Sequence, residues 1–132
     1  VERKAENAVA VADFLSSHDA VDRIYYPHHS SHPQHELARR QMSHGGTILS
    51  FTIPGGRDEA FALLNQLELI DISNNLGDSK SLACHPASTT HEGIGPEGRD
   101  VMGIGENLIR LSLGLEHKDD LIGDLAHALG AL

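Results

Sequence analysis

Apolar and polar residues recur with two different periods along the chain, and these periods predict its helices and strands. Apolar residues return every three or four positions in residues 1–15, 57–67 and 119–132, which is the spacing of one helix face. A fourth helix is expected after Ser31, which can cap it, with Pro33 in its first turn. The pattern therefore predicts four helices.

Five other segments have the composition or the alternation of short strands. Residues 107–115 show the period of two most plainly, because Ile109 and Leu111 fall on one face and Arg110 on the other. The remaining strands are expected within residues 21–26, 45–56, 69–72 and 81–84. Helices that alternate with short strands predict an α/β fold, a two-layer sandwich of a small, mostly antiparallel sheet with helices on one face.

Composition narrows the class of protein. The 132 residues suit one domain, and a net charge of −9 argues against nucleic acid or an anionic membrane surface as partner. No apolar run is long enough for a membrane span. A single cysteine, Cys84, favours a reducing compartment, so we expect a cytoplasmic protein. Because Val1 already lies in a helical pattern, we expect the chain to be part of something longer.

Two histidine groups and one glycine run could carry chemistry. The group His28, His29, His32 and His35 lacks cysteine or a nearby aspartate, so solvated or packing histidines are favoured over a metal site. His85 and His91 lie in no ligand motif and are also expected to be structural. The run GIGPEG, residues 93–98, matches a dinucleotide motif only in its letters, because no strand precedes it and no long helix follows.

Cys84 and Arg110 are the two remaining candidates. Cys84 and the following His85 point to opposite faces of a strand, so the histidine cannot activate the thiol, and a buried, inert cysteine is expected. The Arg110 guanidinium could bind a carboxylate through paired donors, or it could simply occupy the solvated face of the sheet. The residues alone favour the second interpretation.

The motifs NNLGDSKSLACHPASTTH and GIGENLIRLSLGLEHKDDLIGDLAHAL resemble the C-terminal domain of the Cys/Met-metabolism family of pyridoxal-phosphate (PLP) enzymes. The resemblance extends over essentially the whole chain, so residues 1–132 are expected to be one substrate-binding domain, with residues 1–17 as the helix that enters from a PLP-binding domain. Within the family, NLGD and HPASTTH are most similar to O-succinylhomoserine sulfhydrylases. These enzymes make homocysteine from an O-acylhomoserine and sulfide.

The resemblance also implies the residues of a substrate site. The arginine of the LIRLS strand, Arg110, binds the amino-acid α-carboxylate in the family. Asn75 and Leu76 are expected to hold the same carboxylate, largely through their backbone, and Thr90 to support it by a hydrogen bond. Where γ-lyases and γ-synthases more often carry serine and methionine, this chain has Asn75 and Thr89. Asn74 replaces an acidic residue of some γ-lyases, which argues against lyase specificity.

The catalytic parts implied by the resemblance are absent from this sequence. The chain has three lysines, Lys4, Lys80 and Lys118, and none lies in the family's cofactor-lysine context. We therefore expect no catalytic residue and no bound PLP here, and a homotetramer for the full-length enzyme. A cystathionine γ-synthase or methionine γ-lyase domain, or a non-catalytic interaction domain of the same fold, is the alternative.

Overall fold

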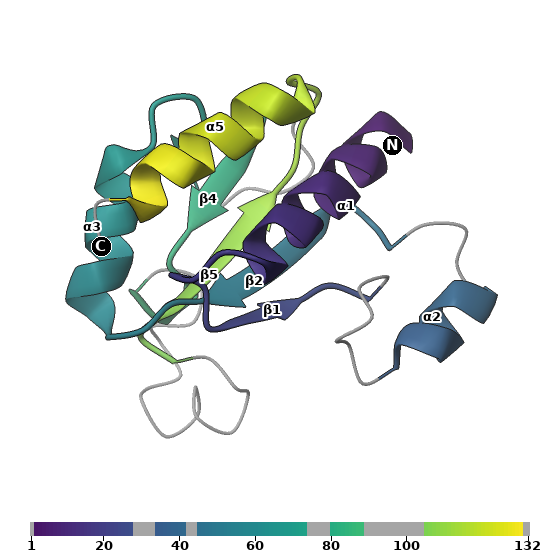
Figure 1. Cartoon of the computed structure of the whole chain (residues 1–132), viewed down its shortest axis with the longest axis horizontal. Coiled ribbons are helices and arrows are strands. Elements are labelled where there is room, and N and C mark those ends of the chain that lie inside the picture. Colours follow the sequence, from purple (N-terminus) through teal and green to yellow (C-terminus); the bar gives the residue numbers. More distant parts are fainter. Residues whose placement is uncertain (1, 28–33, 42–44, 74–79, 89–104, 131–132) are drawn as a thin grey trace.

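The computed structural model describes residues 2–27, 34–41, 45–73, 80–88 and 105–130. Helices and strands alternate through these residues (Figure 1). In chain order they are α1 (Glu2–Ser16), β1 (Arg23–Tyr25), α2 (His35–Gln41), β2 (Ile48–Thr52), α3 (Arg57–Gln66), β3 (Asp71–Ile72), β4 (Leu82–Cys84), the 3-10 helix η1 (Pro86–Ser88), β5 (Leu108–Ser112) and α5 (Lys118–Leu129). The α/β fold class predicted from the sequence is confirmed.

The five strands form one sheet in the order β1-β2-β5-β4-β3. β2 and β4 flank β5, the last strand in the sequence, and both run antiparallel to it. β1 pairs with β2 antiparallel, and only the edge pair β3 and β4 is parallel. The sheet is therefore mostly antiparallel, as expected, and Arg110 lies at the centre of its central strand.

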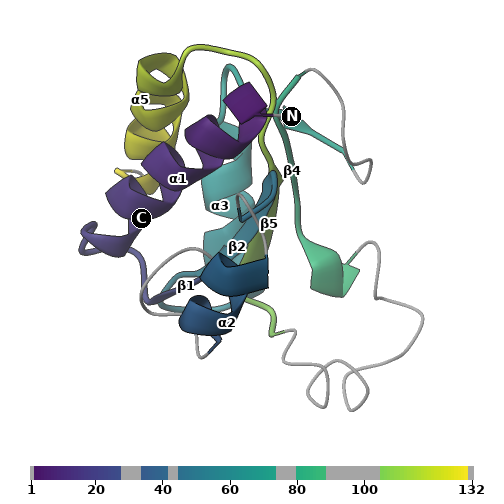
Figure 2. The same cartoon turned by 90° about the vertical axis from the view of Figure 1, so that its right-hand side faces the viewer.

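Three helices cover one face of the sheet. Figure 2 shows α1 and α5 side by side with α3 on one side of the strands, while η1 lies on the other side. The core between these layers is continuous, and its largest fully buried side chains include Phe51, Ile109, Leu111 and Leu125. Burial of this apolar surface is the main favourable contribution to folding.

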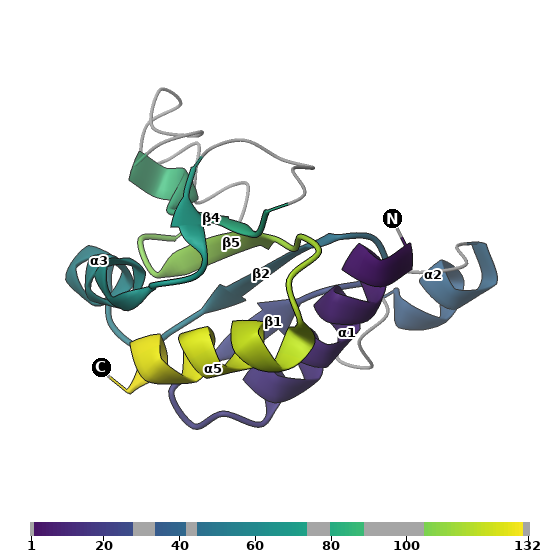
Figure 3. The same cartoon turned by 90° about the horizontal axis from the view of Figure 1, so that it is seen from above.

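The short helix α2 stands apart from the other three helices (Figure 3). It begins at His35, whereas its expected cap Ser31 and first-turn Pro33 lie outside the described residues. Leu37, one of its apolar residues, is exposed. Ile109 and Leu111 point into the core beneath the three helices, so Arg110, which lies between them in β5, is on the opposite face of the sheet.

The ends of α3 and α5 follow from local chemistry. Acidic side chains occupy the first turn of both helices, where they stabilise the positive end of the helix dipole. His117 caps α5 because its Nδ1 atom accepts a hydrogen bond from the Asp119 N–H at 3.1 Å. Gly130 follows the last helical residue of α5.

No helix among the described residues is long and apolar enough to cross a membrane.

Candidate functional site

Arg110 leaves the sheet on the face opposite the helices. Its neighbours Ile109 and Leu111 are buried in the core, and strand side chains alternate between faces. The Arg110 side chain itself is partly exposed, whereas the residues before and after it in β5 are buried. The backbone of Arg110 is thus held in the central strand of the sheet, and the residue is partly exposed.

Arg110 has small neighbours on both adjoining strands. Its partner on β2 is Ser50 and its partner on β4 is Cys84. The Leu113 N–H donates to the Thr47 oxygen at 2.8 Å, and ladder bonds recur at every second pair, so Ser50 and Arg110 form a non-hydrogen-bonded pair. Side chains approach most closely in such pairs, and a serine there leaves room for the guanidinium.

Cys84 is buried, as predicted, and takes part in no disulfide. It lies on the Arg110 face of β4, whereas the ring of the following residue, His85, packs against Phe61 of α3 with centroids 5.0 Å apart. The thiol and the imidazole thus belong to different faces of the sheet. This arrangement offers no nucleophile and base pair.

His85 has the contacts of a structural side chain. Its Nε2 atom donates to the backbone oxygen of Glu106 at 2.6 Å. The Glu106 carboxylate accepts two hydrogen bonds from the Arg57 guanidinium, at 2.9 and 3.1 Å. These contacts tie the end of β4 to the turn before β5 and to α3, in agreement with the structural role expected for His85.

Three of the four residues that the resemblance placed in the substrate site lie outside the described residues. Asn75 and Leu76 fall in residues 74–79, and Thr90 falls in residues 89–104. His28, His29, His32 and His91 are also outside. Both segments join β4, the strand beside Arg110, because one precedes it and the other follows it through η1. Arg110 is the predicted substrate residue that the structure places directly.

A buried polar network surrounds the start of β4, and no sequence motif indicated it. Ser81 donates its N–H and its hydroxyl to the two oxygens of the Glu116 carboxylate, at 2.9 and 2.8 Å. The Ser81 hydroxyl also accepts the Gly114 N–H at 2.8 Å. Asn7 of α1 donates to the backbone oxygens of Gly114 and Glu116 at 3.0 and 2.7 Å. The partners are up to 109 positions apart in the sequence, so a local sequence pattern cannot indicate these contacts.

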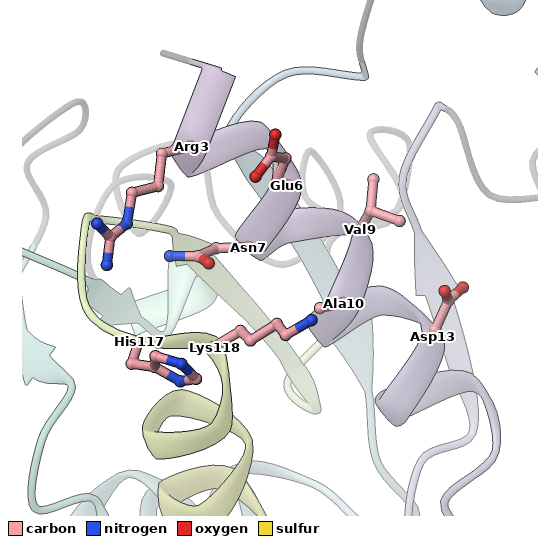
Figure 4. Close-up of a pocket in the computed structure, with 8 residues that line it drawn as sticks. All are labelled: Arg3, Glu6, Asn7, Val9, Ala10, Asp13, His117 and Lys118. Carbon is pink, nitrogen blue, oxygen red and sulfur yellow. The ribbon is translucent and has the colours of Figure 1, made fainter.

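A pocket of about 650 Å³ lies between α1 and the start of α5. Its lining carries both charges, including Arg3, Glu6 and Lys118, and Asn7 projects toward His117 (Figure 4). The pocket is on the helix side of the sheet and does not contain Arg110. It is therefore separate from the site predicted from the sequence.

A bound metal ion would need several ligands, and a Schiff-base cofactor would need a lysine. Among the described residues, no group of three histidine, cysteine, aspartate or glutamate side chains could hold a metal ion. The described lysines do not fit a buried cofactor lysine, because Lys80 pairs with Asp71 at the surface (3.1 Å), Lys118 is exposed and Lys4 is partly exposed. What the described chain offers is a guanidinium on a rigid sheet, which is suited to binding a carboxylate.

The described chain is thus an α/β domain with a partly exposed arginine at the centre of its sheet. A family model described as Cys/Met metabolism PLP-dependent enzyme matches residues 1–130. The chain belongs to this family, and the recognition made from its motifs is confirmed.

Similar proteins support the family assignment. The chain is 49% identical over 133 residues to an O-succinylhomoserine sulfhydrylase of Mycobacterium tuberculosis, covering 98% of this chain and 33% of the relative. It is 46% identical over 131 residues to a cystathionine γ-lyase of Sus scrofa, covering 99% and 32%. The chain thus spans about one third of the length of these relatives.

A solved structure has the same fold. It is the crystal structure of a protein assigned as an O-acetylhomoserine (thiol)-lyase from Campylobacter jejuni, with N′-pyridoxyl-lysine-5′-monophosphate. The TM-score is 0.94 at 39% sequence identity, and the match covers 98% of this chain and 31% of the other.

Proposed function

We propose that this chain is the C-terminal substrate-binding domain of a PLP-dependent sulfhydrylase, with residues 1–17 as the helix that connects it to a PLP-binding domain. The full-length enzyme makes homocysteine from O-succinylhomoserine and sulfide. The bond between the γ-carbon and the ester oxygen breaks, a carbon–sulfur bond forms, and succinate leaves. The identity to the M. tuberculosis sulfhydrylase supports this choice within the family.

Arg110 is proposed to bind the α-carboxylate of the amino-acid substrate. The observation that carries the proposal is its position at the centre of the sheet, partly exposed, on the face that the three helices leave uncovered. A guanidinium presents two parallel donors to a carboxylate, and a strand holds it more rigidly than a loop does. Asn75, Leu76 and Thr90 are proposed as the other residues of this site, because they lie in the motifs NLGD and HPASTTH.

The cofactor of the full-length enzyme is proposed to be PLP, held by residues outside this chain. When bound, it withdraws electrons from the substrate. The role of this domain is to orient the substrate, because fixing the carboxylate aligns the bond to be broken. The isolated chain is therefore expected to be inactive. Borohydride reduction with added PLP should leave no adduct at one specific lysine, and a specific adduct together with turnover would contradict this.

The carboxylate assignment is tested with Arg110→Ala in the full-length enzyme. We expect kcat/KM for O-succinylhomoserine to fall about 100-fold or more, the usual cost of removing one member of a charged hydrogen-bonded pair. Arg57→Ala is the matched control, because its guanidinium pairs with Glu106 at the surface and should leave kcat/KM within a few fold. Unchanged kinetics in Arg110→Ala would disprove the assignment.

A second candidate reaction is γ-elimination. The 46% identity to the Sus scrofa cystathionine γ-lyase favours it almost as strongly as the sulfhydrylase match favours replacement. Two assays of the full-length enzyme distinguish replacement from elimination. The first supplies O-succinylhomoserine plus sulfide, and the second supplies cystathionine or methionine alone. Homocysteine formation only in the first assay supports the sulfhydrylase, whereas release of ammonia and an α-keto acid in the second supports a lyase.

A further inference from the structure

We propose that His85 is a positioning residue for Arg110, because its side chain anchors the end of the strand that holds the Arg110 backbone. The inference rests on the proposed function, since a displaced guanidinium affects the reaction only if Arg110 binds the substrate carboxylate. His85 acts here through a backbone contact and transfers no proton.

The backbone of Arg110 is directed toward β4. Ser50 and Arg110 form a non-hydrogen-bonded pair, and a strand residue points its N–H and C=O toward the same neighbour, so those of Arg110 point away from β2. On the β4 side its partner is Cys84. The Ser73 N–H donates to the Ala83 oxygen, so the backbone groups of Ala83 point toward β3 and those of Cys84 toward β5. The pairing with Cys84 is therefore the one that holds the backbone of Arg110 in the sheet.

Cys84 is also the last residue of β4. Pairing of β4 with β5 ends at Cys84 and Arg110, and η1 begins two residues later, at Pro86. The ends of hydrogen-bonded elements have the lowest local stability. β2, in contrast, continues to pair with β5 for two further residues, as far as Thr52 and Leu108. Loosening of the sheet beside Arg110 would thus begin on the β4 side.

His85 joins the two strands beyond their last pair. It directly follows Cys84, and its Nε2 atom donates at 2.6 Å to the backbone oxygen of Glu106, four residues before Arg110. The side chain is buried, and its ring packs against Phe61 of α3 with centroids 5.0 Å apart. Without the Nε2 donor, the end of β4 loses this link to the chain that leads into β5. The Cys84 backbone, and with it that of Arg110, is then held less firmly.

The test compares His85→Phe with Tyr26→Phe in the full-length enzyme. Each change removes a side-chain donor to a backbone oxygen and keeps a buried aromatic ring. The Tyr26 contact with Gly46 lies beside β1 and β2, at the side of the sheet away from β4. We expect His85→Phe to raise KM for O-succinylhomoserine about tenfold with kcat changed less, because a small misplacement of a positioning group is costly. Tyr26→Phe should lower the melting temperature and leave KM within twofold.

A second pair of variants separates the hydrogen bond from the ring. His85→Gln keeps an amide N–H about as far along the side chain as Nε2, whereas His85→Asn is one carbon shorter and should not reach the Glu106 oxygen. We expect KM to stay within a few fold of the wild type in His85→Gln and to rise about tenfold in His85→Asn, which keeps the proposal testable if His85→Phe does not fold. Equal effects of the Gln and Asn variants, or a loss confined to kcat, would overturn the positioning role.

Arg110→Ala serves as the reference for the proposed function. If it lowers kcat/KM while the His85 variants change KM no more than Tyr26→Phe does, the positioning role is wrong and the carboxylate assignment stands. If Arg110→Ala leaves kcat/KM unchanged, the carboxylate assignment is wrong and the role inferred for His85 is wrong with it.

Discussion

Ser50 and Arg110 face each other across β2 and β5 as a non-hydrogen-bonded pair on the side of the sheet opposite α1, α3 and α5. Their side chains share one face at the closest spacing that antiparallel strands allow. Ser50 is therefore a small polar neighbour of the guanidinium on that face. Whatever replaces Ser50 therefore acts directly on Arg110.

Ser50→Glu should weaken binding of the substrate carboxylate without unfolding the domain. The new carboxylate is placed to pair with the Arg110 guanidinium and to compete with the substrate. We expect KM for the amino-acid substrate of the full-length enzyme to rise at least tenfold. Ser50→Gln is the neutral control of nearly equal size and should raise KM much less. Equal effects of the two variants would mean that bulk, and not charge, disturbs the site.

Asp124 should contribute strongly to stability. It is nearly buried in α5, and its carboxylate accepts the N–H groups of Glu68, Leu69 and Ile70 at 2.8, 3.0 and 2.9 Å. Asp124→Ala leaves these donors without the acceptor and should lower the free energy of unfolding by about 3 kcal/mol. Urea denaturation measures the loss. Asp120→Ala, an exposed change in the same helix, should cost less than about 1 kcal/mol.

Two glycine substitutions should change stability in opposite directions. A Cβ at Gly45 would lie 2.7 Å from Cζ of the buried Tyr26 ring, so Gly45→Ala must displace that ring and should destabilise by about 1–3 kcal/mol. Gly123 is inside α5, and a Cβ there meets nothing within 4 Å. Gly123→Ala should stabilise by about 1 kcal/mol through helix propensity. Thermal melts measure both changes. A melting temperature that rises for Gly45→Ala or falls for Gly123→Ala would contradict the corresponding prediction.

Tyr26 should make stability fall at alkaline pH. Burial raises the pKa of Tyr26 above its usual value, and its hydroxyl donates to the Gly46 oxygen at 2.9 Å. Above about pH 10 the unfolded chain loses this proton before the folded chain does, so the contribution present below that pH is lost as the pH rises.

The check is urea denaturation of the wild type and Tyr26→Phe between neutral pH and pH 11. The variant should be about 1 kcal/mol less stable at neutral pH, because it lacks the hydrogen bond, and should decline less steeply at high pH. Tyr25→Phe removes an exposed tyrosine instead and should keep the wild-type decline. Parallel curves for the wild type and Tyr26→Phe would contradict the role of this hydroxyl.

Much of the fold could be predicted because burial repeats along the chain. The alternation around Arg110 placed Ile109 and Leu111 in the core, where both are found. The same alternation predicted a longer strand, residues 107–115, than the structure has. β5 ends at Ser112, and Leu115, which lies beyond it, is 43% exposed. Residues 45–56 likewise contain a strand only over Ile48–Thr52, since Pro54 and a Gly55 with φ of 105° follow it.

The polar contacts could not be predicted because their partners are distant in sequence. Asp124 looks like an ordinary polar residue of an amphipathic helix, and its role depends on residues 68–70 packing against α5. Asn7 sits among the apolar positions of α1 with no local sign that residues 114 and 116 will meet it. Periodicity specifies which face of an element is buried. It does not specify which other element will cover that face.

The central place of β5 has a consequence for how the chain folds. β2 and β4, which flank it, cannot complete the sheet until residues 108–112 have left the ribosome and inserted between them. Until then the inner edges of β2 and β4 expose unpaired backbone groups, which are templates for pairing with other chains. Folding of this domain must therefore await its late residues, and a nascent or truncated chain ending before β5 should aggregate where the complete one does not.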